Sequence, residues 1–259
     1  MAQKDRLESI RRSIQLEKKV TVSQLSRELG VTEETIRRDL EKLEQEGILT
    51  RTHGGAVLNT SSVSENIDYL VRANHNRREK EIMGQLAVSV IPDRASICAD
   101  ASSTVMEAVR LLKGQPDITL LTNSVQIINE LYQSAFTVVS TGGTVNKNTF
   151  SMQGKAVRKI LADYYVDIVL ISCKALNLNG GIFDSNEEEG ELKRLMVERG
   201  QKIILIADHS KFDRVAFIKV MDVDKLDILV TDREPSPAWK ALCREKNIQL
   251  VVPDSGGAE

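Results

Sequence analysis

The chain has little of what marks a membrane, secreted or metal-binding protein. No apolar run among its 259 residues approaches the roughly 18 residues that a membrane span needs, which excludes an integral membrane protein. The N-terminal segment 1–6 leads into a charged amphipathic pattern without the apolar core of a signal peptide. The three cysteines are odd in number and widely spaced, so neither a disulfide framework nor a metal pair is expected. Together these absences indicate a protein of the reducing cytoplasm.

The chain also has almost no net charge, at −2 overall, which by itself does not favour nucleic acid as a partner. Residues 1–55 hold eleven Lys and Arg against ten Asp and Glu, a balance of +1, so no strongly basic domain is hidden in the total. What the chain does have is 41% hydrophobic residues, enough for a buried core, in a length that suits one large domain or two. DNA binding would therefore depend on a few placed arginines rather than on a general positive field.

Apolar residues at helical spacing predict three short helices before residue 48. The first covers about residues 4–16, the second is capped by Ser23 and stops at Gly30, and the third is capped by Thr32 and stops at Gly47. The expected inward residues are Leu7, Ile10, Ile14, Leu25, Leu29, Ile36, Leu40 and Leu43. A hairpin over residues 48–58 follows, turned at 53–55, which makes the unit a winged helix-turn-helix.

The face of the third helix that its apolar stripe leaves free carries side chains suited to DNA. Arginine pairs with guanine in the major groove, threonine contacts phosphates or thymine methyl groups, and a glycine-rich wing suits close approach to the backbone. The candidate DNA-binding residues are Ser23, Thr32, Glu34, Thr35, Arg37, Arg38, Arg51, His53, Gly54 and Gly55. An ordinary helical hairpin with solvated charges fits the same residues.

The second part of the chain alternates short β-branched runs with helical stretches, which predicts a mostly parallel α/β sheet. The predicted strands are 95–99, 118–121, 136–140, 166–172, 202–207, 226–230 and 248–252, and the predicted helices are 80–90, 104–112, 125–132, 156–162 and 188–199. Residues 59–76 are rich in Ser, Asn and Arg and are expected to form a linker. The predicted organisation is therefore a DNA-binding domain at 1–58, a linker at 59–76, an α/β domain at 77–253 and a frayed tail at 254–259.

Polar or glycine-rich segments follow five of the predicted strands, where parallel sheets bind ligands. They are residues 100–104, 122–124, 141–144, 172–174 and 208–211. Hydroxyls, helix-start N–H groups and lysines suit a small polyhydroxy anion, although each segment alone is also explained as a helix cap.

Cys98 and Cys173 are expected to be small buried residues, and Trp239 is expected to serve packing. His75 and His209 have no partners at ligand spacing, so no metal and no cofactor are expected.

The string Val22 to Leu40, with Thr-Ile-Arg-Arg-Asp-Leu at its end, and the wing Arg51 to Ala56 resemble the DeoR family of bacterial transcriptional regulators. The polar strand ends of the second part resemble the effector domain of the same family, so the resemblance spans almost the whole chain. It implies that the third helix reads the major groove and that the wing grips the backbone. It also implies an α/β domain similar in fold to ribose-5-phosphate isomerases and CoA transferases, a phosphorylated sugar as ligand, and a dimer or tetramer on operator DNA.

The resemblance also implies roles for individual residues. Ser102, Ser103 and Thr104 would cradle a phosphate. The residues that would face the sugar or neighbouring phosphate oxygens are Asp100, Lys174, Glu189, Lys193 and Lys211, and the remaining candidate effector residues are Thr122, Asn123, Gly142, Gly143, Asp184 and Asp208. The segment 184–187 departs from the Thr-rich stretch common in the family and resembles members that answer to deoxyhexose catabolites such as fucose or rhamnose phosphates. A turn that caps the next helix explains the same segment.

These observations favour a repressor of a carbohydrate catabolic operon whose operator binding is controlled by a sugar phosphate. The alternative is a sugar-phosphate isomerase that carries a DNA-binding head, with Asp100, Asp184 or Glu189 as its base. A structural adaptor without an effector is a third hypothesis, and only the polar strand ends argue against it.

Overall fold

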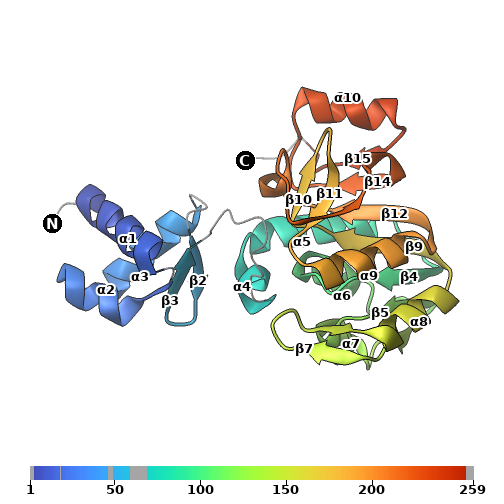
Figure 1. The fold of residues 1–259 in the computed structure, drawn as a ribbon, viewed down its shortest axis with the longest axis horizontal. Coiled ribbons are helices and arrows are strands. Elements are labelled where there is room, and N and C mark those ends of the chain that lie inside the picture. The colour runs from blue at the N-terminus through green and yellow to red at the C-terminus, as the bar shows by residue number, and fades with distance from the viewer. Residues whose placement is uncertain (1–2, 18, 46–48, 59–68, 255–259) are drawn as a thin grey trace. The chain divides into compact units, whose positions relative to one another are not determined.

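The computed structural model describes residues 3–17, 19–45, 49–58 and 69–254, which form two compact units (Figure 1). The first unit comprises residues 1–62 and 70–75, and the second comprises residues 63–69 and 76–259. The predicted helix stop at Gly47 and the tail residues 255–259 lie outside the described residues. In the part of the chain that the structure describes, no helix is both long and apolar enough to cross a membrane.

The first unit is a three-helix winged helix-turn-helix. Its elements are α1 (Gln3–Glu17), β1 (Lys19–Thr21), α2 (Val22–Leu29), α3 (Glu33–Gln45), β2 (Leu49–Thr52) and β3 (Gly55–Leu58). The strands form an antiparallel sheet in the order β1-β3-β2, so the predicted hairpin gains a third strand that the sequence pattern did not reveal. Its core contains the buried residues Ile10, Ile14, Val20, Val22, Leu25, Ile36, Leu40, Leu43, Leu49 and Ala56.

The helix boundaries of this unit follow from local capping. Gly30 ends α2 in a left-handed conformation with φ of 64°, as predicted for a residue without a Cβ. The prediction that Ser23 caps α2 is wrong, because the Thr21 hydroxyl accepts the hydrogen bond from the Gln24 N–H and Ser23 lies inside the first turn. β1 runs directly into α2, which places the last residue of the strand, rather than Ser23, at the cap position.

The second unit is built around a seven-stranded parallel sheet. Its strands are β4 (Ala95–Ala99), β5 (Ile118–Thr122), β6 (Thr137–Ser140), β9 (Val166–Ser172), β12 (Gly200–Ile206), β14 (Ile228–Val230) and β15 (Gln249–Val251). Each of the seven predicted strands appears in this sheet, with ends that differ by a few residues. The helices are α5 (Arg77–Val88), α6 (Ser103–Leu111), α7 (Val125–Leu131), α8 (Lys155–Asp163), α9 (Glu187–Val197) and α10 (Pro237–Glu245).

The strand order is β15-β14-β12-β9-β4-β5-β6, so the chain first builds outward from β4 in one direction and then returns to the other side of β4 with β9. The order therefore reverses between β4 and β9. In open parallel sheets such a switch point leaves a crevice outside the carboxyl ends of the two strands.

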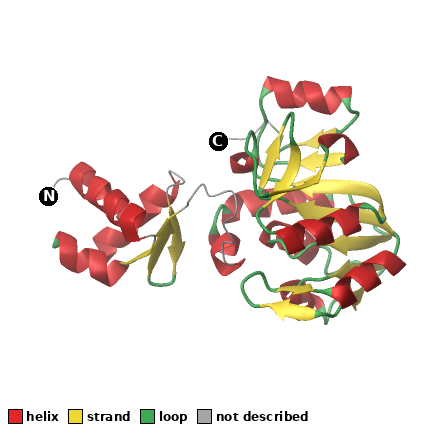
Figure 2. Cartoon of the chain, viewed as in Figure 1, coloured by secondary structure: helices red, strands yellow, loops and turns green. Residues whose placement is uncertain are grey.

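Alternate side chains of the strands belong to two separate cores, one on each face of the sheet. Figure 2 shows helices packed around this sheet. On one face Ile97, Leu170 and Ile204 pack with side chains of α5, α6 and α7. On the other face Cys98 and Val169 pack with side chains of α8, α9 and α10. This three-layer arrangement confirms the predicted α/β class, and it follows from the two-residue period of strands that are buried on both sides.

Several short elements escaped the sequence pattern. They are the hairpin β7 (Thr144–Asn146) and β8 (Ser151–Gln153), the antiparallel sheet of β10 (Ala175–Asn177), β11 (Gly181–Asp184) and β13 (Ile218–Met221), the short helices η1 (His209–Lys211) and η2 (Val223–Lys225), and α4 (Tyr69–Asn74). Helix α4 lies within the expected linker, where Tyr69 is buried and packs edge-on against Phe150. The described part of that segment therefore has regular structure.

Candidate DNA-binding surface and effector site

The outer face of α3 carries the predicted DNA-reading side chains. Glu34, Arg37 and Arg38 are exposed, as is Thr32, whereas Thr35 is half-buried. Arg37 pairs with Glu33 at 2.8 Å and Arg38 pairs with Glu34 at 3.5 Å, each one turn along the helix. Exposed pairs of this kind contribute only about 0.3–0.5 kcal/mol, so both guanidinium groups can be redirected to a nucleic acid at little cost.

The start of α3 is capped as the sequence predicts. The Thr32 hydroxyl accepts a hydrogen bond from the Thr35 N–H at 3.3 Å and contacts the Thr35 hydroxyl at 2.9 Å. This fixes the first turn, from which residues reach base edges in helix-turn-helix proteins.

Asp39, which belongs to the Thr-Ile-Arg-Arg-Asp-Leu string, faces the interior and not the DNA-reading surface. Its carboxylate accepts hydrogen bonds from Arg6 Nε at 2.5 Å and from an Arg6 terminal nitrogen at 3.2 Å. The Asp39 side chain is 1% exposed and the Arg6 side chain 11%. This forked pair locks α1 to α3 and thereby sets the orientation of the α3 face that carries Arg37 and Arg38.

The wing is tied back to the helices at its turn and at its first strand. The Val22 N–H donates to the Gly54 carbonyl at 2.8 Å, and the Arg51 N–H donates to Glu44 Oε1 at 2.8 Å. Burial raises the pKa of Glu44, and the Arg51 N–H and charge act in the opposite direction. His53 and Gly54 are exposed at the turn and Arg51 is half-buried.

The packing of the wing sheet requires glycine at position 55, a reason that the sequence did not suggest. A Cβ at this position would lie 1.9 Å from the Val20 carbonyl oxygen, so only glycine permits the close pairing of β3 with β1. The residue is buried, and its role in the wing is therefore to shape the sheet.

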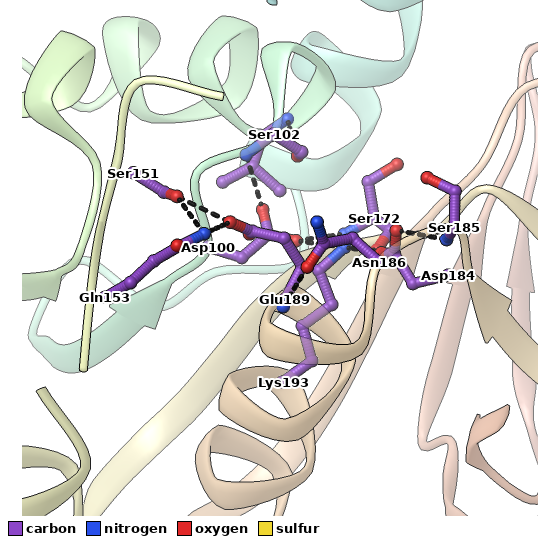
Figure 3. Close-up of polar contacts among 11 residues, drawn as sticks. Asp100, Ser102, Ser151, Gln153, Ser172, Asp184, Ser185, Asn186, Glu189 and Lys193 are labelled. Atoms are coloured by element: carbon purple, nitrogen blue, oxygen red, sulfur yellow. Dashed lines mark hydrogen bonds and ion pairs between the residues drawn. The ribbon is translucent and has the colours of Figure 1, made fainter. Parts of the chain in front are cut away.

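At the switch point of the second unit, Lys193 of α9 joins three segments of the chain (Figure 3). Its ammonium lies 3.1 Å from Asp100 Oδ2 and 2.5 Å from Asp184 Oδ2, and it donates to the Ser172 carbonyl at 2.7 Å. Burial by itself lowers the pKa of Lys193, but the charges of Asp184 and Asp100 outweigh it and raise that pKa. The lysine is therefore a fixed cation at neutral pH.

Asp100 lies at the centre of the polar side chains at this switch point and is hydrogen-bonded to two other segments. Its two carboxylate oxygens accept hydrogen bonds from the Ser102 N–H at 3.0 Å and from the Ser172 N–H at 3.1 Å. The aspartate thus ties the end of β4 to the start of α6 and to the end of β9. Because the residue is 1% exposed and its carboxylate is occupied by protein donors, it shapes the crevice. The expectation that it faces the sugar directly does not fit this geometry.

Glu189, in the first turn of α9, reaches toward β8 (Figure 3). Its carboxylate accepts hydrogen bonds from Ser151 Oγ at 2.5 Å and from Gln153 Nε2 at 2.7 Å. The sequence indicated Glu189 but neither partner, because β8 contains no β-branched residue that would mark it as a strand. Asn186 caps α9 through a hydrogen bond from the Glu189 N–H, which confirms the capping explanation for Asn186, whereas Asp184 pairs with Lys193.

The N-terminus of α6 is the part of the crevice best suited to an anion. The Ser102 hydroxyl caps the helix by accepting from the Val105 N–H at 3.1 Å. Ser103 and Thr104 are 4% and 5% exposed, and their hydroxyls form no hydrogen bond with any residue that the structure describes. This is consistent with the predicted phosphate role, which helix-start N–H groups would share.

At the end of β5, the Thr122 hydroxyl is used in hydrogen bonds within the protein, whereas one buried atom of Asn123 has no partner among the described residues. Thr122 donates to the Ala99 carbonyl at 2.8 Å and accepts from the Ser124 N–H at 3.1 Å, so its hydroxyl stabilises the turn. Asn123 donates to the Met152 carbonyl at 3.2 Å, whereas its buried Oδ1 has no hydrogen-bond partner among the described residues.

Gly142 and Gly143 follow β6 and have φ of 60° and 106°. A Cβ at Gly143 would lie 2.6 Å from the Gln153 carbonyl oxygen. Backbone conformation and close packing against β8 therefore account for this pair.

A second polar group surrounds Asp208, which we name the Asp208 cluster: Asp208, Ser210, Lys211 and Asn76. The Asp208 carboxylate accepts from the Ser210 N–H at 2.9 Å and from Asn76 Nδ2 at 3.2 Å, and it lies 3.8 Å from the Lys211 ammonium. Burial by itself raises the pKa of Asp208, but Lys211, the Ser210 hydrogen bonds and the buried Lys80 lower it to about 2. Asn76 and Lys80 were not among the predicted effector residues, and both act here on the Asp208 carboxylate.

Cys173 shows that the Asp208 cluster and Lys193 are neighbours. Burial raises the pKa of its thiol to about 12, while the charges of both Lys193 and Lys211 act on it in the opposite direction. Lys174 is half-buried at the same strand end, where its N–H donates to the Phe183 carbonyl at 3.0 Å.

The remaining candidates serve packing. The three cysteines are free and buried, and burial also raises the pKa of the Cys98 thiol. Trp239 is fully buried, packs edge-on against Phe212 and donates to Asp213 Oδ1 at 2.9 Å. His209 Nδ1 lies 2.8 Å from Asp232 Oδ2.

Comparison with protein families matches both units of the chain. Residues 6–62 match the DeoR-like helix-turn-helix domain, and residues 75–233 match the DeoR C terminal sensor domain. The chain belongs to the DeoR family.

Relatives in this DeoR family match along nearly the whole chain. A protein of Bacillus subtilis named uncharacterized HTH-type transcriptional regulator YulB is 35% identical, with 96% of each chain covered. The HTH-type transcriptional repressor GlcR of the same organism is 33% identical, with 97% of each chain covered. The L-fucose operon activator of Haemophilus influenzae is 32% identical, with 90% of this chain and 94% of the relative covered.

Among solved structures, this DeoR-family chain is similar to ribose 5-phosphate isomerase A from Methanocaldococcus jannaschii. The likeness covers 53% of this chain and 55% of that one, with 15% identity and a TM-score of 0.41. This degree of likeness says nothing about activity.

Proposed function

We propose that this chain is a DNA-binding repressor of a carbohydrate operon and that a phosphorylated sugar controls its affinity for operator DNA. The winged unit would bind the operator through the outer face of α3 and the wing, and the sensor unit would bind the sugar phosphate. Two winged units in a dimer or tetramer would read paired half-sites, because a single unit carries few basic groups.

The observation that carries the proposal is the cluster of polar side chains at the point where the strand order reverses. It combines unoccupied hydroxyls at the start of α6 with an acid-rich group around Lys193 and with the cation of Lys211. Phosphate suits the helix N-terminus, and sugar hydroxyls can donate to the carboxylate of Glu189, whose hydrogen bonds from Ser151 and Gln153 both use Oε1. A ligand with both features, a sugar phosphate, therefore fits the crevice better than a simple anion does.

The isomerase alternative needs a carboxylate that takes a proton from carbon. Asp100 and Asp184 are ion-paired with Lys193, and Glu189 accepts hydrogen bonds from Ser151 and Gln153. These arrangements favour ligand binding over proton abstraction. Measured turnover of pentose and hexose phosphates at high protein concentration would restore the enzyme hypothesis.

A thermal-shift panel tests the ligand. Fuculose 1-phosphate, rhamnulose 1-phosphate, glucose 6-phosphate, ribose 5-phosphate and glycerol 3-phosphate are compared with inorganic phosphate and with the unphosphorylated sugars. Ligand at a hundredfold excess over its Kd adds about 2.7 kcal/mol to the free energy of unfolding. For a domain of this size, this raises the melting temperature by roughly 5–11 °C. A shift by inorganic phosphate equal to that of every sugar phosphate would contradict a sugar-phosphate site.

Two substitutions separate the two sites. Lys211→Ala should abolish the thermal shift and leave DNA binding intact, and Lys240→Ala, which removes a half-buried lysine paired with Glu234, serves as its control. Arg38→Ala should weaken binding to a duplex from the chain's own promoter region by about 5- to 150-fold and leave the thermal shift intact. Arg38→Lys keeps the positive charge but loses the paired N–H donors of the guanidinium group, so it distinguishes base reading from phosphate contact.

The hypothesis of a regulator falls if the wild-type protein gives no salt-dependent shift of that duplex relative to a scrambled one. The two-site assignment falls if either Arg38→Ala or Lys211→Ala removes both activities in a folded protein. Because one relative is named an activator, the direction of the ligand's effect is read from the duplex titration with and without the sugar phosphate.

A further inference from the structure

Residues 70–75 of the first unit are followed directly by Asn76 of the second unit, whose side chain is hydrogen-bonded to the candidate effector residue Asp208. Asn76 precedes α5 with φ of 50°, and its Nδ2 donates to Asp208 Oδ1 at 3.2 Å. Asp208 also lies 3.8 Å from Lys211. A ligand that engages Oδ1 of Asp208 would compete with Asn76 for that atom, and one that engages Lys211 would draw the cation away from the same carboxylate.

The residue on the other side of the same peptide bond is tied to the DNA-binding unit. His75 belongs to the first unit, and its Nδ1 lies 3.5 Å from the Thr50 hydroxyl. Thr50 is buried in β2, next to the wing residue Arg51. One peptide bond thus separates a contact to the wing strand from a contact to the effector carboxylate.

Tyr69, which opens α4, is fastened to the same sensor unit. Its N–H donates to the Asn148 carbonyl at 2.8 Å, and its ring packs against Phe150 with a centroid distance of 5.8 Å. Phe150 is followed by Ser151, the hydrogen-bond partner of Glu189. Of the two residues that border the segment 70–75, Asn76 therefore contacts a candidate effector residue directly. Tyr69 contacts Phe150, whose neighbour Ser151 is hydrogen-bonded to Glu189.

We propose that Asn76 is the coupling residue of this regulator: its hydrogen bond to Asp208 reports occupancy of the effector site, and His75 passes the change to the wing through Thr50. The inference rests on the proposed function and adds to it the residues that connect the two sites. A ligand changes DNA affinity only if it favours one of two arrangements, and the Asn76–Asp208 bond, made or released, supplies the two.

The test measures the Kd for the promoter-region duplex with and without ligand and takes the ratio of the two values. The ligand is the panel compound that shifts the wild-type melting temperature most. A coupled regulator typically shows a ratio of about 5- to 150-fold. Asn76→Gly keeps the left-handed backbone available and removes the side chain with its amide, so it should bring the ratio to within about twofold of 1 while the thermal shift remains. Asn74→Ala is the matched control, because among the described residues the Asn74 amide bonds within α4, to the Leu70 carbonyl at 3.1 Å.

The path to the wing is tested by Thr50→Val, which keeps the shape and removes the hydroxyl. It should lower the ratio as Asn76→Gly does, and the double variant should be no worse than either single one, because both break the same path. A wild-type ratio in Asn76→Gly overturns the inference and leaves the proposed function standing. Loss of the thermal shift in Asn76→Gly also overturns it, since Asn76 would then belong to the binding site itself. A wild-type protein whose ratio is 1 refutes the proposed function and the inference with it.

Discussion

Removal of the Asp39 carboxylate should unfold the first unit at a much lower temperature and leave the second unit unchanged. In the native unit this carboxylate neutralises Arg6 through two hydrogen bonds at 2.5 and 3.2 Å. Asp39→Ala leaves a guanidinium that is only 11% exposed without its partner. The perturbation thus creates an uncompensated charge at the contact between α1 and α3.

The magnitude follows from burial. Removal of one partner from a fully buried ion pair costs about 3–5 kcal/mol, and the residual exposure of Arg6 places this pair at the lower end, about 3 kcal/mol. A domain of about 60 residues has a total stability of only about 3–9 kcal/mol, so the loss is a large share of it. The melting temperature of the first unit should fall by about 12–24 °C.

The assay is differential scanning calorimetry of the full chain, together with titration of the duplex. Only the transition of the first unit should move, and DNA binding should disappear at a temperature where the sugar-phosphate shift persists. Glu8→Ala is the control, because this carboxylate is 77% exposed and lies 3.6 Å from Arg11 on the same helix, where a surface pair contributes about 0.5 kcal/mol or less. The double variant Arg6→Met/Asp39→Leu should recover most of the loss. A shift below about 4 °C for Asp39→Ala, or a double variant no better than the single one, would refute the reasoning.

Three further perturbations probe the wing and the crevice. Gly55→Ala should destabilise the first unit by about 2 kcal/mol or more, because the new Cβ would lie 1.9 Å from the Val20 carbonyl oxygen, and melting of the first unit measures this. Lys193→Ala should cost the second unit about 3 kcal/mol in urea unfolding, since the buried Asp100 loses the cation at 3.1 Å. Asp208 has a pKa near 2, below the ordinary value of 3.8, so it stabilises the second unit at neutral pH and this contribution, about 2 kcal/mol, is lost as the pH falls from about 4 toward 2.

Each of these has a control. Gly54→Ala should leave melting within about 1 kcal/mol of wild type, since nothing lies near its Cβ position, and an equal loss for both glycines would contradict the steric argument. An unchanged urea midpoint for Lys193→Ala would show that the crevice carboxylates do not need the cation. Asp208→Asn should show a flatter acid dependence than wild type in that pH range, and an equal slope would remove Asp208 from the explanation.

The sequence by itself determined the elements whose causes are local. β-branched and aliphatic runs predicted the seven strands of the main sheet, because such runs stand out from the polar segments beside them. Gly30 and Thr32 marked the turn between α2 and α3, since a left-handed residue and a capping hydroxyl act within a few residues. The exposed arginines of α3 were found because a helix with one apolar stripe leaves a definite opposite face.

The tertiary structure decided what distant residues do to one another. Asp39 and Arg6 are 33 residues apart, and Glu189 and Ser151 are 38 apart, so no periodicity could pair them. Thr21 took the cap that Ser23 was expected to supply, because the incoming strand β1 pairs with the wing. Asp100 was selected as a sugar contact, yet the reversal of strand order buries it among three segments. Which side chains line a crevice depends on strand order and packing, and those depend on the free energy of the whole fold.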